Sequence, residues 1–236
     1  MSIIKIPCIL VATVGLHKTF TPPNIASKGE TLPEAGLRDW LLMMSRNLLG
    51  SIKFVHWVVG IAEAAIIWAN NWPLAPGSNQ ILSKLILQGN ANDICLTPLS
   101  VSGMILITLG TLLRMRCYQA MKKFFTFDVS IRKDHKLVTT GPYRIVRHPS
   151  YSGLLVVYAG MACWYGSRGS WLRESGILGT NGGVLFFGIF SVMRGTALAG
   201  LLSRMPIEDD ALRKRFGDEW VEYAHRVPYS LIPWMY

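Results

Sequence analysis

The segment 134–153 gathers side chains that could bind a small polar ligand. Two histidines and two tyrosines precede or begin an apolar stretch there, namely His135, His148, Tyr143 and Tyr151. Gly141-Pro142 is typical of a turn, and Pro149 favours the first turn of a helix. His148 should therefore lie where a loop meets a helix, beside backbone N–H groups that have no partner within the helix.

Each of these residues also has an ordinary structural interpretation. Arg144 and Arg147 are typical of the positive flank of a membrane span, and Tyr143 and Tyr151 of an interfacial aromatic belt. A single histidine at a helix start is more often a capping or solvated group than a catalyst. Only the combination of these residues favours a functional site.

Two further pairs of charged residues require the same choice. Arg204 and Glu208 follow the last apolar stretch, where they either reach water and offset a helix dipole or line a pocket at the membrane. In such a pocket the guanidinium could bind a carboxylate or phosphate through two N–H groups. Glu63 and Arg194 lie inside apolar stretches, either as a structural ion pair or as functional residues.

The elements that must position these residues are apolar and helical. Of 236 residues, 50% are hydrophobic and 16% are charged, with a mean hydropathy of +0.31, whereas soluble domains carry about 25% charged residues. Five apolar stretches cover residues 3–16, 48–69, 94–113, 151–166 and 177–202. Three of them reach the roughly 20 residues that cross a bilayer. The first could be a secretory signal sequence, but it lacks a clear cleavage site and we favour a retained span.

Basic residues are concentrated in alternate connections between these stretches. The connection after the third stretch carries nine Lys and Arg, the first connection carries four and the C-terminal tail carries five. The remaining connections and the N-terminus carry one or two each. Because Lys and Arg gather on the cytosolic side, the pattern predicts five spans with a cytosolic C-terminus. It also explains the net charge of +10 without a nucleic-acid partner.

Other classes of protein are disfavoured. The four cysteines lie far apart, which argues against a zinc site and a disulfide scaffold. No segment alternates with the period of a strand, and no glycine-rich turn follows one, so a Rossmann nucleotide site is not expected. From Pro206 onward, an apolar stripe at helical spacing predicts an amphipathic helix; it comprises Leu212, Phe216, Trp220, Tyr223 and Val227. The predicted fold is an all-α integral membrane protein with about five transmembrane helices plus this C-terminal amphipathic helix.

Two motifs contain the candidate residues. The first is His135-x-Leu-Val-Thr-x-Gly-Pro-Tyr-x-x-x-Arg-His-Pro-x-Tyr-x-Gly153, and the second is Arg204-x-x-x-Glu-Asp-x-x-Leu-x-x-x-Phe-Gly-x-x-Trp-x-x-Tyr-x-x-x-Val-Pro228. In this order they resemble the two conserved blocks of the isoprenylcysteine carboxyl methyltransferase family. Membrane phospholipid methyltransferases share much of the first motif, and some membrane sterol reductases share the general architecture.

The resemblance implies S-adenosylmethionine as methyl donor and the C-terminal carboxylate of a prenylated cysteine as acceptor, in the endoplasmic reticulum membrane. It implies donor contacts from both motifs: His135, Lys136, Leu137, Val138, Tyr143, His148, Pro149, Ser150, Tyr151 and Glu208. Arg204 would bind the substrate, and Arg204 and Glu208 are the expected catalytic residues, with no metal. We expect one membrane domain over 1–236, with N-terminal spans and loops in 1–90 and the methyltransferase core in 91–236.

Three positions depart from the family pattern. Asp128 replaces a common amide, Asp209 replaces a Glu, and Trp220 replaces a common Tyr.

A carboxylate acceptor suits these residues chemically. Its pKa is about 3.5, so it is ionised at neutral pH and needs no general base. The protein would mainly position two reactants and exclude water, while the prenyl chain stays among the spans. Three alternatives stay open: a lipid-amine methyltransferase, an NADPH-dependent membrane reductase, and a non-catalytic membrane scaffold.

Overall fold

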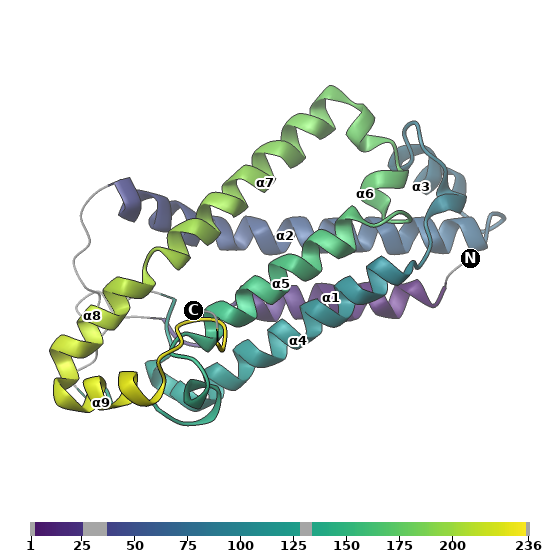
Figure 1. Cartoon of the computed structure of the whole chain (residues 1–236). Helices are drawn as coiled ribbons and strands as arrows, with labels where there is room; N and C mark the ends of the chain where they lie inside the picture. Colours follow the sequence, from purple (N-terminus) through teal and green to yellow (C-terminus); the bar gives the residue numbers. More distant parts are fainter. Residues whose placement is uncertain (1–2, 26–36, 128–133, 235–236) are drawn as a thin grey trace.

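The computed structural model describes residues 3–25, 37–127 and 134–234, with side chains from residue 50 onward in the second range. All regular secondary structure in these ranges is helical, as predicted. Helices α1 (Lys5–Thr19), α2 (Leu37–Asn71), α4 (Pro98–Met121) and α5 (Pro149–Gly166) run side by side, and α7 (Asn181–Leu202) crosses them at an angle (Figure 1). The N-terminal end of α1 lies at one end of the bundle, and α8 and α9 lie at the other.

Three helices in the described ranges are long and apolar enough to cross a membrane. They span Gly50–Asn71, Pro98–Phe124 and Asn181–Phe216, with mean hydropathies of 1.5, 1.4 and 1.7. α1 has 15 residues and α5 has 18. The structure therefore supports membrane spans for three of the five stretches, and the count of five stays a prediction. α2 begins at Leu37, eleven residues before the predicted stretch.

Close packing of α4 against α5 depends on glycine. A Cβ atom on Gly110 would lie 2.5 Å from the Gly153 carbonyl oxygen, and one on Gly160 would lie 2.7 Å from the Ile107 nitrogen. Only residues without a side chain allow two helix backbones to approach this closely. The contact at Gly110 and Gly153 holds α4 directly beside the start of α5.

α1 completes the core on the other side of α4. Its buried residues Ile9, Ala12 and Leu16 belong to the hydrophobic cluster that also contains Ile107 of α4. At the C-terminal end of α1, the hydroxyl groups of Thr19 and Thr111 are 2.8 Å apart and share a hydrogen bond. The first apolar stretch is thus a packed helix of the bundle.

α7 is the most loosely packed of the long helices. Among its residues only Gly183 and Arg194 are buried, so most of its apolar surface faces outward, as expected for a helix in lipid. At its N-terminal end it is linked to α5 through the short elements α6 (Trp171–Glu174) and η4 (Ile177–Gly179). At its other end it continues into α8 (Met205–Phe216).

The predicted C-terminal amphipathic helix is divided into two. α8 ends at Phe216 and α9 (Asp218–Arg226) begins two residues later. Gly217 between them has a φ of +55°, which L side chains rarely adopt and which interrupts the helix. The start was predicted correctly, because Pro206 lies in the first turn of α8. The segment before α4 contains α3 (Ser78–Leu85) and η1 (Ala91–Asp93).

Candidate active site

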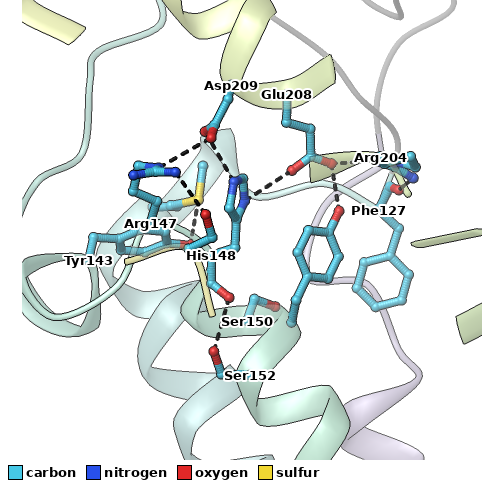
Figure 2. A network of polar contacts seen from close by, with 12 residues as sticks. Phe127, Tyr143, Arg147, His148, Ser150, Ser152, Arg204, Glu208 and Asp209 are labelled. Atoms are coloured by element: carbon cyan, nitrogen blue, oxygen red, sulfur yellow. Dashed lines mark hydrogen bonds and ion pairs between the residues drawn. The ribbon is translucent and has the colours of Figure 1, made fainter. Parts of the chain in front are cut away.

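The first turns of α5 and α8 meet on one carboxylate, that of Glu208 (Figure 2). The Tyr151 hydroxyl donates to its Oε1 at 2.5 Å, and Nη2 of Arg204 donates to the same oxygen at 3.0 Å. Nδ1 of His148 lies 3.6 Å from Oε2. The structure thus brings together four predicted site residues from two motifs that are more than 50 residues apart.

A second carboxylate, Asp209, extends the cluster. Nε2 of His148 lies 3.1 Å from Oδ1 of Asp209, and Nε of Arg147 donates to Oδ2 at 3.2 Å. His148 therefore lies between two carboxylates. It occupies the cap position before Pro149, as predicted from the sequence. Asp209 entered the sequence analysis only as a departure from a motif, and the structure makes it part of the cluster.

The two carboxylates form the accessible edge of the cluster. The side chains of Glu208 and Asp209 are 21% and 17% exposed, whereas those of Arg204 and His148 are 8% and 7% exposed. Accessible carboxylate oxygens can accept hydrogen bonds from the hydroxyl or ammonium groups of a ligand. The buried guanidinium of Arg204 is also fixed by a backbone group, because its Nη1 donates to the carbonyl of Phe127 at 2.9 Å.

Arg147 ties the C-terminal segment 227–231 to the start of α5. Its guanidinium donates to the carbonyls of Val227 and Pro228 and to Oγ of Ser230, at 3.1, 2.7 and 2.7 Å. The backbone N–H of His148 also donates to the Ser230 carbonyl, at 2.9 Å. The sequence treats Arg147 as a possible flanking charge, and the contacts show that it fixes the position of His148.

The first half of the first motif lies apart from this cluster. The imidazole of His135 is 4.7 Å from the ring of Phe124 and 6.0 Å from that of Phe216, centroid to centroid. Lys136 is exposed, Leu137 is half-buried, and Val138 packs against a cluster that includes Tyr143. His135 therefore lies near the C-terminal end of α8, whereas Glu208 lies in its first turn.

Tyr143 points into the protein. Its hydroxyl donates to Sδ of Met121 at 2.9 Å, and its carbonyl accepts from the Tyr223 hydroxyl at 2.9 Å. Burial raises the pKa of Tyr143 well above its ordinary value and the pKa of Tyr223 to about 12, so both remain neutral donors at physiological pH. The hydroxyl of Ser150 is likewise engaged, as an acceptor from Arg114 at 2.9 Å.

The sequence left two interpretations of Glu63 and Arg194 open, and the structure contradicts a direct ion pair between them, because each has other partners. Glu63 lies 2.5 Å from Nζ of Lys5. Arg194 donates toward Nε2 of His56 at 3.2 Å, and its guanidinium lies 4.8 Å from the ring centres of Phe20 and Tyr158. Both residues are buried, and none of the contacts described for them involves Glu208 or Asp209.

Within the described ranges, no group of three or more His, Cys, Asp and Glu side chains is arranged to hold a metal ion. Asp128, which the motif comparison singled out, lies outside the described residues.

Comparison with known proteins identifies relatives of this chain. Residues 99–173, which include α5 and all of α4 except its first residue, match the family model of phospholipid methyltransferases. A protein-S-isoprenylcysteine O-methyltransferase B of Arabidopsis thaliana is 34% identical over 53% of this chain and 55% of its own length. A probable protein-S-isoprenylcysteine O-methyltransferase of Oryza sativa subsp. japonica is 30% identical over 56% and 60%.

The chain is similar to isoprenylcysteine methyltransferases. A further Arabidopsis relative, protein-S-isoprenylcysteine O-methyltransferase A, is 28% identical over 53% of this chain and 55% of its own length. The resemblance predicted from the two motifs is thereby confirmed. The chain spans a little more than half the length of the relatives it matches.

Sequence reasoning did not reveal that Arg114 and Arg147 support the cluster around Glu208 through hydrogen bonds. Arg147 and Arg114 both lie in the basic connection before the fourth stretch, where their charge alone indicates only a membrane flank. Each of them donates to two backbone carbonyls far away in the chain, and no side-chain pattern marks a carbonyl. The one available signal was the position of Arg147 inside the first motif.

Proposed function

We propose that this chain is an S-adenosylmethionine-dependent methyltransferase that esterifies the C-terminal carboxylate of prenylated cysteine. The observation that carries the proposal is the convergence of Tyr151, His148 and Arg204 on Glu208 where α5 and α8 begin. The relatives named isoprenylcysteine methyltransferases support the same activity. We expect the site at the cytosolic face of the endoplasmic reticulum membrane, because the connections that form it are the basic ones.

The chemical groups at the site fit the donor. The accessible carboxylates of Glu208 and Asp209 can accept hydrogen bonds from ribose hydroxyls or from an ammonium group. Phe216, beside His135, follows Glu208 by eight residues, about 12 Å along α8. Aromatic groups at that distance can stack on a base. When bound, S-adenosylmethionine supplies a methyl group on a sulfonium, which a carboxylate can displace without proton transfer.

The protein's own residues would do three things. Arg204 would bind the acceptor carboxylate through charge-assisted hydrogen bonds. Tyr151 would hold Glu208 in place for the donor. The surrounding helices would exclude water and keep the prenyl chain in an apolar environment. Positioning of this kind can supply about 7–11 kcal/mol of a reaction barrier. No general base is needed, because the acceptor carboxylate is already ionised at neutral pH.

Methylation of a lipid amine is the second candidate, because residues 99–173 match the phospholipid methyltransferase family model. That match ends before α8 and so does not include Arg204 or Glu208. An amine acceptor would have to lose a proton, and it would gain nothing from a guanidinium beside it. The buried Arg204 therefore favours an anionic acceptor.

The decisive experiment is a labelled-methyl transfer assay with several acceptors in the same membranes. The acceptors are a farnesylcysteine, a geranylgeranylcysteine, the amide of each, and phosphatidylethanolamine. The proposal predicts methyl transfer to the two carboxylates and none to the amides, which differ from them only in the reacting group. Transfer to phosphatidylethanolamine alone would establish the second candidate, and binding of NADPH without S-adenosylmethionine would refute both.

Replacement of the proposed acceptor-binding residue should affect the two substrates differently. Arg204→Ala should lower kcat/KM for a prenylcysteine by about 30-fold or more, because truncating one partner of a buried charge contact costs about 2–5 kcal/mol. Donor affinity, measured by titration of purified protein, should change by less than about fivefold. Arg213→Ala removes the same charge from an exposed position of α8 and serves as control. Unchanged prenylcysteine methylation by Arg204→Ala would refute the assigned role.

A further inference from the structure

Arg114 is a buried cation directly behind the candidate active site. The sequence places it among the basic residues that flank a span, yet its side chain is only 5% exposed. Nη1 donates to the carbonyl and to Oγ of Ser150, at 3.0 and 2.9 Å, and Nη2 donates to the carbonyl of Thr19 at 3.3 Å. One guanidinium thus connects α4 with the end of α1 and the first turn of α5.

The same guanidinium lies between two aromatic rings. Its centre is 5.5 Å from the ring of Tyr118 and 5.4 Å from that of Phe127. The carbonyl of Phe127 is the group that accepts from Arg204. Arg114 therefore contacts both supports of the cluster: Ser150, which precedes Tyr151, and Phe127, which holds Arg204.

The stability of the bundle does not explain a cation at this position. None of the described partners of Arg114 is a carboxylate, and its buried Nε has no hydrogen-bond partner. Burying a charge costs several kcal/mol unless it is well compensated. The first turn of α5 carries the positive end of the helix dipole, which disfavours a nearby cation. An apolar side chain of similar size would fill the space at lower cost.

Helix packing is arranged so that this contact can form. A Cβ atom on Gly153 would lie 3.0 Å from Cγ of Arg114 and 2.9 Å from the carbonyl oxygen of Gly110. Any side chain at Gly153 would push α5 away from α4, and the guanidinium would no longer reach Ser150. The Arg114 contacts therefore depend on the close approach of the two helices.

We propose that Arg114 is a positioning residue: by fixing Ser150 and Phe127, it holds Tyr151 and Arg204 in register on Glu208. This inference rests on the proposed methyltransferase function for its effect on turnover, but its geometric part does not. Arg114 need not touch either substrate, so it should influence the rate of the chemical step more than acceptor affinity.

The test compares Arg114→Met and Arg114→Lys with Arg116→Met. Arg116 lies two residues further along the same helix with an exposed side chain, so its replacement matches the loss of charge. Kinetics are measured per folded protein, and hydrogen exchange is followed in residues 147–153 in lipid nanodiscs. Arg114→Met should lower kcat about 10- to 100-fold with the acceptor KM within about threefold, and should speed exchange in 147–153. Arg114→Lys, which can still donate to Ser150, should recover part of both, and Arg116→Met should change neither.

The two readouts separate this inference from the proposed function. Unchanged exchange in residues 147–153 of Arg114→Met would overturn the inference whatever the enzyme does. Faster exchange with unchanged kcat would also overturn it, because Arg114 would then be merely structural. If the wild-type protein methylates no acceptor, the proposed function fails, and exchange alone decides whether Arg114 positions α5. If Arg114→Met does not fold, Arg114→Lys is tested instead. A lower kcat together with faster exchange in residues 147–153 supports the inference, and a wild-type value of either measurement overturns it.

Discussion

One cluster of opposite charges lies where α1 begins, and another lies where α8 begins, at the opposite end of the bundle (Figure 1). The two clusters differ in how accessible their side chains are. At the end where α1 begins, Lys5 and Glu63 are 1% and 2% exposed and lie 2.5 Å apart. Lys5 also donates to the carbonyl of Gly169 at 2.6 Å, and Glu63 accepts from the N–H of Trp171 at 3.3 Å. At the other end, Glu208 is 21% exposed.

The difference separates a structural clamp from a candidate binding site. The Lys5–Glu63 pair joins α1 and α2 to the connection between α5 and α6 and to the start of α6, and both side chains are almost fully buried. Such a pair can fasten helices but is closed to a ligand. Around Glu208 and Asp209, the side chains of His148 and Arg204 are buried, whereas the two carboxylates are partly accessible. Accessible acceptors backed by buried donors are the arrangement expected of a ligand site.

Breaking the buried Lys5–Glu63 ion pair should have the largest effect on stability. Glu63→Ala leaves the Lys5 ammonium buried without its carboxylate, which typically costs about 3–5 kcal/mol. The double variant Lys5→Met/Glu63→Leu should recover most of that loss, because it removes both charges. Denaturant titration in detergent measures both free energies of unfolding. A loss below about 1 kcal/mol for Glu63→Ala would show that the pair is not a clamp.

Removing one hydrogen bond from the cluster around Glu208 should affect activity more than stability. Tyr151→Phe deletes the donor to Glu208, and a hydrogen bond to a charged group contributes about 1.5–3 kcal/mol. We expect kcat/KM to fall about 10- to 100-fold. Tyr158→Phe, two turns later on α5, removes a longer contact at 3.4 Å to the Arg194 carbonyl and should change kcat/KM less than about twofold. Equal effects of the two variants would show that the hydrogen bond from Tyr151 to Glu208 has no special role in activity.

An exposed ion pair on α8 should have the smallest effect of all. Nζ of Lys214 lies 2.9 Å from Oδ2 of Asp210, and these side chains are 78% and 61% exposed. Pairs of this kind contribute about 0.3–0.5 kcal/mol, so Lys214→Met should change neither stability nor kcat/KM measurably. A tenfold loss of activity would instead show that the exposed face of α8 takes part in binding.

Features that depend on neighbouring residues were predicted well. Pro149 starts α5 with His148 at its cap, and Pro206 lies in the first turn of α8. Gly141, at the predicted turn, has a φ of +62°. In each case the ring of proline or the missing side chain of glycine restricts the backbone locally, so the prediction did not require the rest of the fold.

Two kinds of feature were not predicted: the break in the C-terminal helix and the partners of the buried charges. The apolar stripe of the tail continues through Gly217, so periodicity alone missed the break between α8 and α9. Glu63 and Arg194 both lie in apolar stretches, and only the packing of the helices assigns Lys5 to one and His56 to the other.

By itself, the sequence determined the helical character, the alternation of basic connections and the two motifs. These follow from hydrophobic periodicity, from local backbone restrictions and from residue identity at fixed spacing. Tertiary structure alone decided which charges are buried and what they touch, including the contact of Arg114 with Ser150 and the convergence on Glu208. The physical reason is that hydrogen bonds act over about 3 Å, so each partner depends on the rotation and spacing of helices that are distant in the chain.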